Sequence, residues 1–434
     1  MRVLMFGWEF PPHISGGLGT ACYGLTKGLS SFNDIHITFV VPKKHGDEDQ
    51  RNIKLIGANE IDLKNFNIDQ VKKFHSLSRK VKLSQLSAYI TPAEFEKLYQ
   101  HKREEKIFSS STSSGGKLGF TGKYGSGLFE EIYRYGLVAS EIARNEPHDI
   151  IHAHDWLTFY AGLEAKKTSG KPLVVHIHAT EFDRCGENLN KQVYELEKYG
   201  MHQADRIITV SDYTRNMVIK KYNIKPEKVV TSHNGVEEIN QYHETPFNFV
   251  KKFNEKVVTF LGRITYQKGP EYFIQAAYKV LQKTKNVRFV MAGSGNLINE
   301  MIKYVARLGI SNKFHFTGFL GEKDVKRMYE NSNLYVMPSV SEPFGISSLE
   351  AIQNNVPVII SKQSGVSEVL KYAIKIDFWD IDKMADAIYG VLNYSALRSF
   401  LTSNGKCEAA YLNWQNTAKK VRDIYFSLLY KMAG

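Results

Sequence analysis

The most constraining feature of this sequence is an early succession of strand, glycine-rich loop, helix and strand. An apolar run over residues 3–6 predicts a buried strand, and a loop with three glycines follows over residues 9–19. A helical pattern over residues 20–29 and a second apolar run over residues 35–41 complete a βαβ unit. This order predicts a parallel sheet, because two parallel strands need a crossover connection between them.

The same alternation returns twice along the chain. Helical patterns alternate with short apolar runs between residues 128 and 232, and again between residues 257 and 361. Residues 236–256 lack periodicity and are the predicted linker. We therefore predict an α/β protein with two Rossmann-like, doubly wound parallel-sheet domains, over residues 1–240 and 250–400. Ligands of such sheets bind beyond the carboxyl ends of the strands, so facing sheets would place a site in the cleft between them.

A polar insertion over residues 43–130 interrupts the first series. It contains the low-complexity stretch 109–116, and we predict short elements and a loop there. Asp47, Glu48 and Asp49 have the DxD form of metal-dependent sugar-nucleotide transferases of another fold. Basic residues flank them, which favours a solvated loop over a metal site.

The composition excludes several classes of protein. With 43% hydrophobic and 24% charged residues, the chain is not expected to be disordered or fibrous. No apolar run approaches the roughly 20 residues that span a bilayer. The first apolar run is followed by Glu9 and two prolines, so no signal peptide is expected. Three scattered cysteines suit a reducing compartment, and we expect a cytoplasmic protein.

The formal charge of +12 favours anionic partners, which include phosphorylated small molecules, anionic lipid and nucleic acid. No nucleic-acid-binding motif is recognised, so we do not expect nucleic acid as a partner. Peripheral binding to a membrane surface stays open, although no Lys/Arg-rich amphipathic helix favours it.

In the first and in the last series of strands and helices, the loop after the first strand could bind an anion. Gly16 and Gly17 open a helix, whose N-terminal N–H groups favour negative charge. The pattern is not the dinucleotide fingerprint, and a plain tight turn is an equal alternative. Arg263 and Lys268 stand beside Gly269 and could clamp a diphosphate, although chance charges in a solvated loop would look the same.

The segment 339–350 is more informative, because it leads from a predicted strand into a predicted helix. Glu342 precedes Pro343, which disfavours helical backbone, so Glu342 belongs to the loop. A helix starting at Gly345 would offer its unpaired first-turn N–H groups to an anion. Glu350 would follow in the second turn. The alternative for each glutamate is an exposed position at a helix entry.

Histidines cluster at the ends of two predicted strands. His178 ends a buried strand and could donate a hydrogen bond to a substrate hydroxyl. His176 shares its face and is more simply a core histidine. His152, His154 and Asp155 suggest metal ligands, but no further ligand cluster stands nearby in the sequence, so we expect no metal.

Taken together, these segments resemble the retaining nucleotide-sugar glycosyltransferases of the GT-B fold. The similarity is greatest to the glycogen and starch synthases and to the large family 4. The motifs follow the family's order over almost the whole chain: GWEFPPHISGGLG, HAHDW, HATEFDR, ADRIITVS, HNGV, LGRITYQKG, MAGSG and Glu342 with Glu350. HAHDW and the opening loop favour α-glucan synthases. Ile14 stands where many bacterial glycogen synthases carry lysine, which leaves the choice of nucleotide open.

The resemblance implies an enzyme that moves glucose from ADP-glucose or UDP-glucose to the non-reducing end of an α-1,4-glucan, without cofactor or metal. The alternative is another sugar nucleotide with a lipid-linked or capsular saccharide acceptor. The resemblance also implies an acceptor-side first domain and a nucleotide-sugar-binding second domain. A last helix over residues 414–431 should return to the first domain.

The resemblance also assigns roles to single residues. His178 contacts the transferred sugar, and Glu342 contacts its hydroxyls near the reacting carbon. Arg263 and Lys268 neutralise the diphosphate and are expected to be exposed, and Glu350 accepts hydrogen bonds from the ribose. The remaining donor-binding residues are Gly16, Gly17, Gly345, Ile346, Ser347, Ser348 and Leu349, and the acceptor-side candidates are Asp155 and Tyr124. A non-catalytic binding protein would be expected to lack some of the four catalytic candidates. All four are present in this sequence: His178, Glu342, Arg263 and Lys268.

Overall fold

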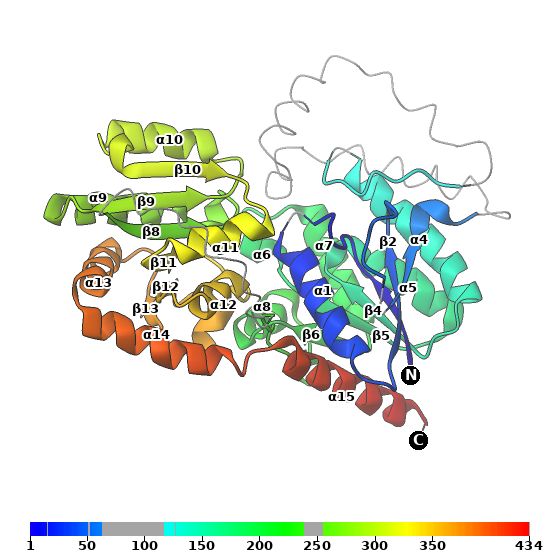
Figure 1. The fold of residues 1–434 in the computed structure, drawn as a ribbon. Coiled ribbons are helices and arrows are strands. Elements are labelled where there is room, and N and C mark those ends of the chain that lie inside the picture. The colour runs from blue at the N-terminus through cyan, green and yellow to red at the C-terminus, as the bar shows by residue number, and fades with distance from the viewer. Residues whose placement is uncertain (15, 51–52, 63–116, 126, 238–254, 434) are drawn as a thin grey trace, which may run out of the picture. The chain divides into compact units, whose positions relative to one another are not determined.

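The computed structural model in Figure 1 divides into two compact units. Unit 1 comprises Met1–Gly235 with Trp414–Gly434, and unit 2 comprises Val236–Asn413. The structure describes residues 1–14, 16–50, 53–62, 117–125, 127–237 and 255–433. Each unit is built on its own parallel sheet, which confirms the prediction of two doubly wound α/β sheets.

Unit 1 contains a seven-stranded sheet in the order β3-β2-β1-β4-β5-β6-β7, with every pairing parallel. The strands are β1 (Arg2–Phe6), β2 (His36–Val41), β3 (Lys54–Gly57), β4 (Ile150–His154), β5 (Leu173–Ile177), β6 (Arg206–Thr209) and β7 (Val229–Thr231). The strand order reverses between β1 and β4. In open α/β sheets such a reversal opens a crevice at the carboxyl ends of the strands.

The helices of unit 1 follow the strands as the alternation predicts. They are α1 (Gly17–Ser30), α4 (Leu128–Asn145), α5 (Trp156–Ser169), α6 (Glu181–Cys185), α7 (Lys191–Gln203), α8 (Asp212–Tyr222) and α15 (Trp414–Ala433), with short 3₁₀ turns η1 (Ala58–Glu60) and η4 (Pro226–Lys228). Helices α4 and α5 pack closely where Gly136 meets Tyr160. A Cβ on this glycine would lie 2.2 Å from the tyrosine Cδ1.

Helix α15 packs against α1 within unit 1, and Figure 1 shows the two helices in red and blue. A Cβ on Gly24 of α1 would lie 2.1 Å from Cε2 of Trp414, so only glycine allows this approach. Further along α15, the hydroxyl of buried Tyr425 is hydrogen-bonded to Nδ1 of His152 in β4. The last helix therefore reaches the strand that carries the candidate site residues of this unit.

Unit 2 contains a six-stranded parallel sheet in the order β10-β9-β8-β11-β12-β13. The strands are β8 (Lys256–Leu261), β9 (Val287–Ala292), β10 (Phe314–Gly318), β11 (Leu334–Met337), β12 (Val358–Ser361) and β13 (Ile374–Ile376). The helices are α9 (Pro270–Lys283), α10 (Ile298–Arg307), α11 (Glu322–Glu330), α12 (Ile346–Gln353), α13 (Ile381–Asn393) and α14 (Ser395–Ala409), with 3₁₀ turns η5 (Tyr266–Lys268), η6 (Ser311–Lys313) and η7 (Gly365–Glu368). The strand order reverses between β8 and β11.

The predicted polar insertion over residues 43–130 is only partly described. Within it, β3 pairs with β2 as the edge strand of the sheet, so these four residues belong to the sheet and not to an insertion. The low-complexity stretch 109–116 and most of the predicted linker lie outside the described residues. Among the helices that the structure describes, none combines the length and the apolar character that a membrane span needs.

Candidate active site

Four imidazoles stack on one face of the unit 1 sheet. His152 and His154 lie in β4, and His154 stands opposite His176 of β5. His178 follows β5 directly. The ring centroids of His152 and His154 are 4.3 Å apart, those of His154 and His176 are 5.4 Å apart, and those of His176 and His178 are 4.4 Å apart. All four residues are buried, so the structure assembles the histidines of both sequence motifs into one cluster.

Burial keeps these histidines neutral. It lowers the pKa of His152 and of His178 to about 3, and it lowers the pKa of His154 and of His176 well below the usual value. Nδ1 of His154 lies 2.9 Å from Nε2 of His178, so one of these rings donates a hydrogen bond to the other. At neutral pH, His178 can therefore donate or accept a hydrogen bond but does not supply a positive charge.

Asp155 holds the loop that carries His178. Its carboxylate Oδ1 accepts hydrogen bonds from the backbone N–H of His178 at 2.6 Å and of Ala179 at 3.3 Å. Its own backbone has φ 58° and ψ 169°, a conformation that costs a side-chain-bearing residue about 1–3 kcal/mol. Burial raises the pKa of Asp155 to about 7, although the Arg184 guanidinium opposes this shift. The structure thus places Asp155 as a fixed support beneath His178.

The start of α1 is open to solvent. Gly16 is the N-cap residue, and both Gly16 and Gly17 are exposed. Among the residues that the structure describes, no atom lies within 4 Å of a Cβ built on either glycine. At Gly19, in contrast, a Cβ would lie 2.5 Å from Cγ2 of Ile14. Ile14 therefore closes the loop against the helix, while the first amides of α1 stay accessible to an anion. Tyr124 is half-buried, and its ring centroid lies 6.5 Å from that of Trp8, which follows β1.

The Asp47–Asp49 carboxylates all have partners within unit 1. Asp47 pairs with His13 at 2.7 Å, and Asp49 accepts a hydrogen bond from the Tyr23 hydroxyl at 3.3 Å. Glu48 is buried and accepts the backbone N–H of His45 and of Gly46, so it stabilises a turn and is not solvated as expected.

In unit 2, an ion pair joins Lys268 of η5 to Glu342, which follows β11. The Lys268 ammonium lies 2.6 Å from Oε2 of Glu342, and the Ser339 hydroxyl donates to the same oxygen at 3.1 Å. The Glu342 side chain is 9% exposed and that of Lys268 is 20% exposed. The expectation that Lys268 is exposed is therefore wrong, because its ammonium pairs with the carboxylate of Glu342, which is itself buried.

Backbone contacts bring these two side chains together. Strand β8 pairs with β11, so the loops after both strands leave the same edge of the sheet. Gly269 adopts φ 63°, and a Cβ there would lie 2.1 Å from the carbonyl oxygen of Pro338. Across the same contact, the backbone N–H of Val340 donates to the Gln267 carbonyl at 2.9 Å. Arg263 stands two residues after β8 and is half-buried.

The motif MAGSG supports the Arg263 loop, a role that the sequence did not reveal. A Cβ on Gly293 would lie 1.9 Å from the carbonyl oxygen of Gly262, and one on Gly295 would lie 2.2 Å from that of Ile264. Both glycines are therefore required for the loop after β9 to pack on the loop that carries Arg263.

Helix α12 begins beside Glu342 in the chain, and two tyrosines anchor its first turn. Tyr329 donates to the carbonyl of Ser347 at 2.8 Å, and the Tyr335 hydroxyl lies 2.8 Å from the Ser347 Oγ. Gly345, the N-cap residue, has φ 111°, which glycine alone adopts readily. Among the predicted donor-binding residues, Ile346 and Ser347 are half-buried, whereas the side chains of Ser348 and Leu349 are buried. The latter two could therefore meet a ligand only through their backbone.

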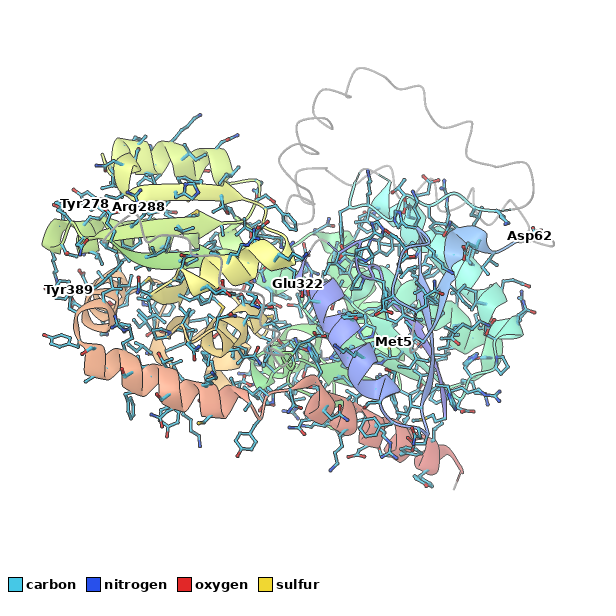
Figure 2. The ribbon with its side chains drawn as sticks, in the orientation of Figure 1. Met5, Asp62, Tyr278, Arg288, Glu322 and Tyr389 are labelled. Carbon is cyan, nitrogen blue, oxygen red and sulfur yellow. The ribbon has the colours of Figure 1, made fainter. Side chains whose placement is uncertain are left out.

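Glu350 carries a strongly perturbed carboxyl on α12. Desolvation raises its pKa to about 7, and the negative charge of Glu322, labelled in Figure 2 at the start of α11, adds to the shift. A carboxylate held in an unfavourable environment is typical of a functional site.

Replacement of Glu350 by glutamine should stabilise the protein above pH 7. Because the folded pKa is raised from 4.5 to about 7, the contribution of this group to stability falls as the pH rises through that window. We expect Glu350→Gln to gain about 1–3 kcal/mol over wild type at pH 8 and little at pH 4.5. Urea unfolding at both values, with exposed Glu330→Gln as the control, measures this, and an equal difference at both pH values would contradict it.

Comparisons with known proteins agree with this architecture. Residues 242–407 match the family model described as Glycosyl transferases group 1, and residues 120–238 match that of Glycosyltransferase Family 4. An uncharacterised glycosyltransferase of Methanocaldococcus jannaschii is 29% identical over 98% of this chain and 98% of its own length.

Two characterised relatives differ in their acceptors. The UDP-Gal:α-D-GlcNAc-diphosphoundecaprenol α-1,3-galactosyltransferase of Escherichia coli is 26% identical over 67% of this chain and 78% of its own length. The glycogen synthase of Mycobacterium tuberculosis is 22% identical over 98% of this chain and 95% of its own length.

Solved structures share the fold over the whole chain. The sucrose-phosphate synthase of Thermosynechococcus elongatus superposes with a TM-score of 0.71 at 15% identity and covers 99% of both chains. The Anabaena HepE structure in complex with UDP-glucose has a TM-score of 0.67 at 17% identity over 98% of this chain and all of that one. The chain thus has the GT-B fold, and its two matched segments are similar to glycosyltransferases.

Proposed function

We propose that this chain is a retaining transferase that moves glucose from ADP-glucose or UDP-glucose to the non-reducing end of an α-1,4-glucan. The observation that carries the proposal is the partly buried ion pair of Lys268 and Glu342, which lie in the loops that follow the neighbouring strands β8 and β11. Helix α12 and its perturbed Glu350 follow in the same segment.

The donor is assigned to unit 2 on chemical grounds. Cleavage of a glycosyl–phosphate bond builds negative charge on the departing diphosphate, which needs oriented cations and N–H groups. Lys268, Arg263 and the first amides of α12 would supply them, and in this proposal no metal ion does so. Glu350 would accept hydrogen bonds from the ribose hydroxyls.

The sugar itself is assigned to Glu342 and His178. Positive charge develops on the ring as the bond breaks, and the Glu342 carboxylate would stabilise it. His178 is neutral, so it would hydrogen-bond a sugar hydroxyl without opposing that charge. Asp155 would act through His178, because its carboxylate holds the backbone of that residue.

The α-glucan acceptor is supported by the full-length similarity to the mycobacterial glycogen synthase and by the HAHDW segment. A second candidate is a lipid-linked saccharide. The E. coli galactosyltransferase, whose name gives such an acceptor, favours it, as does the formal charge of +12.

An acceptor comparison separates the two candidates. The purified chain is incubated with ADP-glucose or UDP-glucose and either maltoheptaose, glycogen or a polyprenyl-diphosphate-linked sugar. We expect maltoheptaose to gain glucose units that an α-1,4-specific exo-hydrolase releases. If glucose is transferred only to the lipid-linked sugar, the α-glucan is not the acceptor and the second candidate takes its place.

A further inference from the structure

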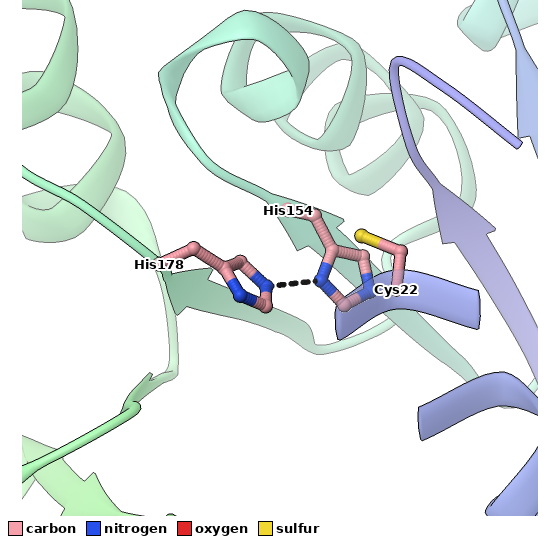
Figure 3. Close-up of side chains that lie close together, drawn as sticks. All are labelled: Cys22, His154 and His178. Carbon is pink, nitrogen blue, oxygen red and sulfur yellow. Dashed lines mark hydrogen bonds between the residues drawn. The ribbon is translucent and has the colours of Figure 1, made fainter. Parts of the chain in front are cut away.

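A buried thiol adjoins the histidine cluster of unit 1. Cys22 of α1 is 1% exposed, and Figure 3 shows its sulfur beside His154, which is hydrogen-bonded to His178. One ligand atom from each of these three residues lies within 4.8 Å of the other two. They come from α1, from β4 and from the end of β5, so the fold alone brings them together.

The cluster contains buried nitrogen atoms that lack partners. Within the part of the chain that the structure describes, the following ring atoms make no hydrogen bond: His152 Nε2, His154 Nε2, His176 Nδ1, His176 Nε2 and His178 Nδ1. A buried polar atom without a partner costs about 1–3 kcal/mol. Two of these atoms, Nε2 of His154 and Nδ1 of His178, can carry the ring hydrogens when an ion takes the place between Nδ1 of His154 and Nε2 of His178.

The ligand chemistry selects the kind of ion. Neutral imidazole and thiolate are the ligands that Zn²⁺ and related soft cations prefer, whereas Mg²⁺ and Ca²⁺ need oxygen ligands. The nearby Asp155 carboxylate is held by two backbone N–H groups through Oδ1.

We propose that Cys22, His154 and His178 form a binding site for a thiophilic cation, with Zn²⁺ as its representative. The ion takes the place of the hydrogen shared by Nδ1 of His154 and Nε2 of His178. Their separation of 2.9 Å must widen to about 3.3 Å, the span of two Zn–N bonds of about 2.0 Å at a tetrahedral angle.

The protons balance in this step. Each imidazole stays neutral and keeps one hydrogen, on Nε2 of His154 and on Nδ1 of His178. The Cys22 thiol releases its proton to solvent, and the resulting thiolate binds the metal. Three protein ligands leave a fourth position for water.

The site has a consequence that rests on the proposed function. Zn²⁺ would bind Nε2 of His178, the atom that faces His154, and would place a positive charge beside the transferred sugar, whose ring itself becomes positive in the transition state. We expect Zn²⁺ to inhibit transfer reversibly, with full recovery on addition of a chelator. The site is therefore inhibitory and is not a cofactor site.

Zinc binding to the full chain tests the site without reference to activity. In competition with a chromogenic chelator, wild type should bind one Zn²⁺. Cys22→Ala should weaken binding by at least about 100-fold, more than is typical when only a ligand's supporting partner is lost. Cys407→Ala, at an exposed cysteine, is the matched control and should bind as wild type does. Co²⁺ should give a thiolate charge-transfer band in wild type and in the control but not in Cys22→Ala.

Thermal melting of Cys22→Ala and of the isosteric Cys22→Ser establishes that each variant is folded. Absence of stoichiometric zinc binding by wild type would overturn the site, as would unchanged binding by both folded Cys22 variants. If zinc binds through Cys22 but transfer continues uninhibited, the site stands and the role proposed for His178 fails.

Discussion

Replacing Lys268 by alanine should lower kcat by about 10²–10³-fold, the effect typical of losing one group that stabilises charge in the transition state. Lys268 would meet the diphosphate as it departs, when its negative charge is greatest. The measurement is steady-state turnover with the donor at saturation. A turnover within a fewfold of wild type would remove Lys268 from the proposed chemistry.

The same substitution should also destabilise unit 2. It leaves Glu342 buried without its counter-charge, which we expect to cost about 1–3 kcal/mol because the pair is only partly buried. The double variant Lys268→Met with Glu342→Gln removes both charges and should recover most of that stability. Its turnover should stay low, which separates the chemical role of the pair from its structural one.

Glu342→Gln should lower kcat by about 10²-fold and change the donor KM little. Glutamine keeps the size of the side chain and can accept the Ser339 hydrogen bond, so the variant removes the negative charge and, with it, the ion pair to Lys268. In the proposal this charge faces the sugar ring, where positive charge develops only in the transition state.

Glu350→Gln is the matched comparison for Glu342→Gln. A ribose contact is equally strong in the ground and transition states, so its loss should raise the donor KM with kcat nearly unchanged. Glutamine also has nearly the helix propensity of glutamate, which spares α12. If Glu350→Gln loses kcat and Glu342→Gln changes only KM, the two roles are reversed. If neither variant differs from wild type by more than a fewfold, both glutamates lie outside the site.

The alternation of elements was predictable because most strands are buried on both faces and read as short apolar runs. Residues 173–176 and 206–210 are examples, and both lie in central strands. Strand β3 was missed because it is a four-residue edge strand inside a polar segment, with Lys54 exposed and only Leu55 and Gly57 buried. Strand β13 has three residues, too few for a period to be recognised.

The residues of the site were easier to predict than their contacts. Lys268 and Glu342 are 74 residues apart, and only the pairing of β8 with β11 makes them neighbours. The motif identified both residues but gave no reason to expect an ion pair. Nothing in the sequence indicated that Cys22 lies beside the histidines, because the sequence of a helix does not show which strands it packs against.

The most direct test of the central claim is nucleoside diphosphate release from a panel of ADP-, UDP- and GDP-sugars with glycogen, for wild type and for the Lys268→Ala, Glu342→Gln and His178→Ala variants. The account predicts that wild type releases ADP or UDP from the glucose donor in an acceptor-dependent manner. It also predicts that each variant releases at least about 10²-fold less while remaining folded. The account would be contradicted if folded wild type released no nucleoside diphosphate from any of the donors. It would also be contradicted if all three variants released it as fast as wild type does.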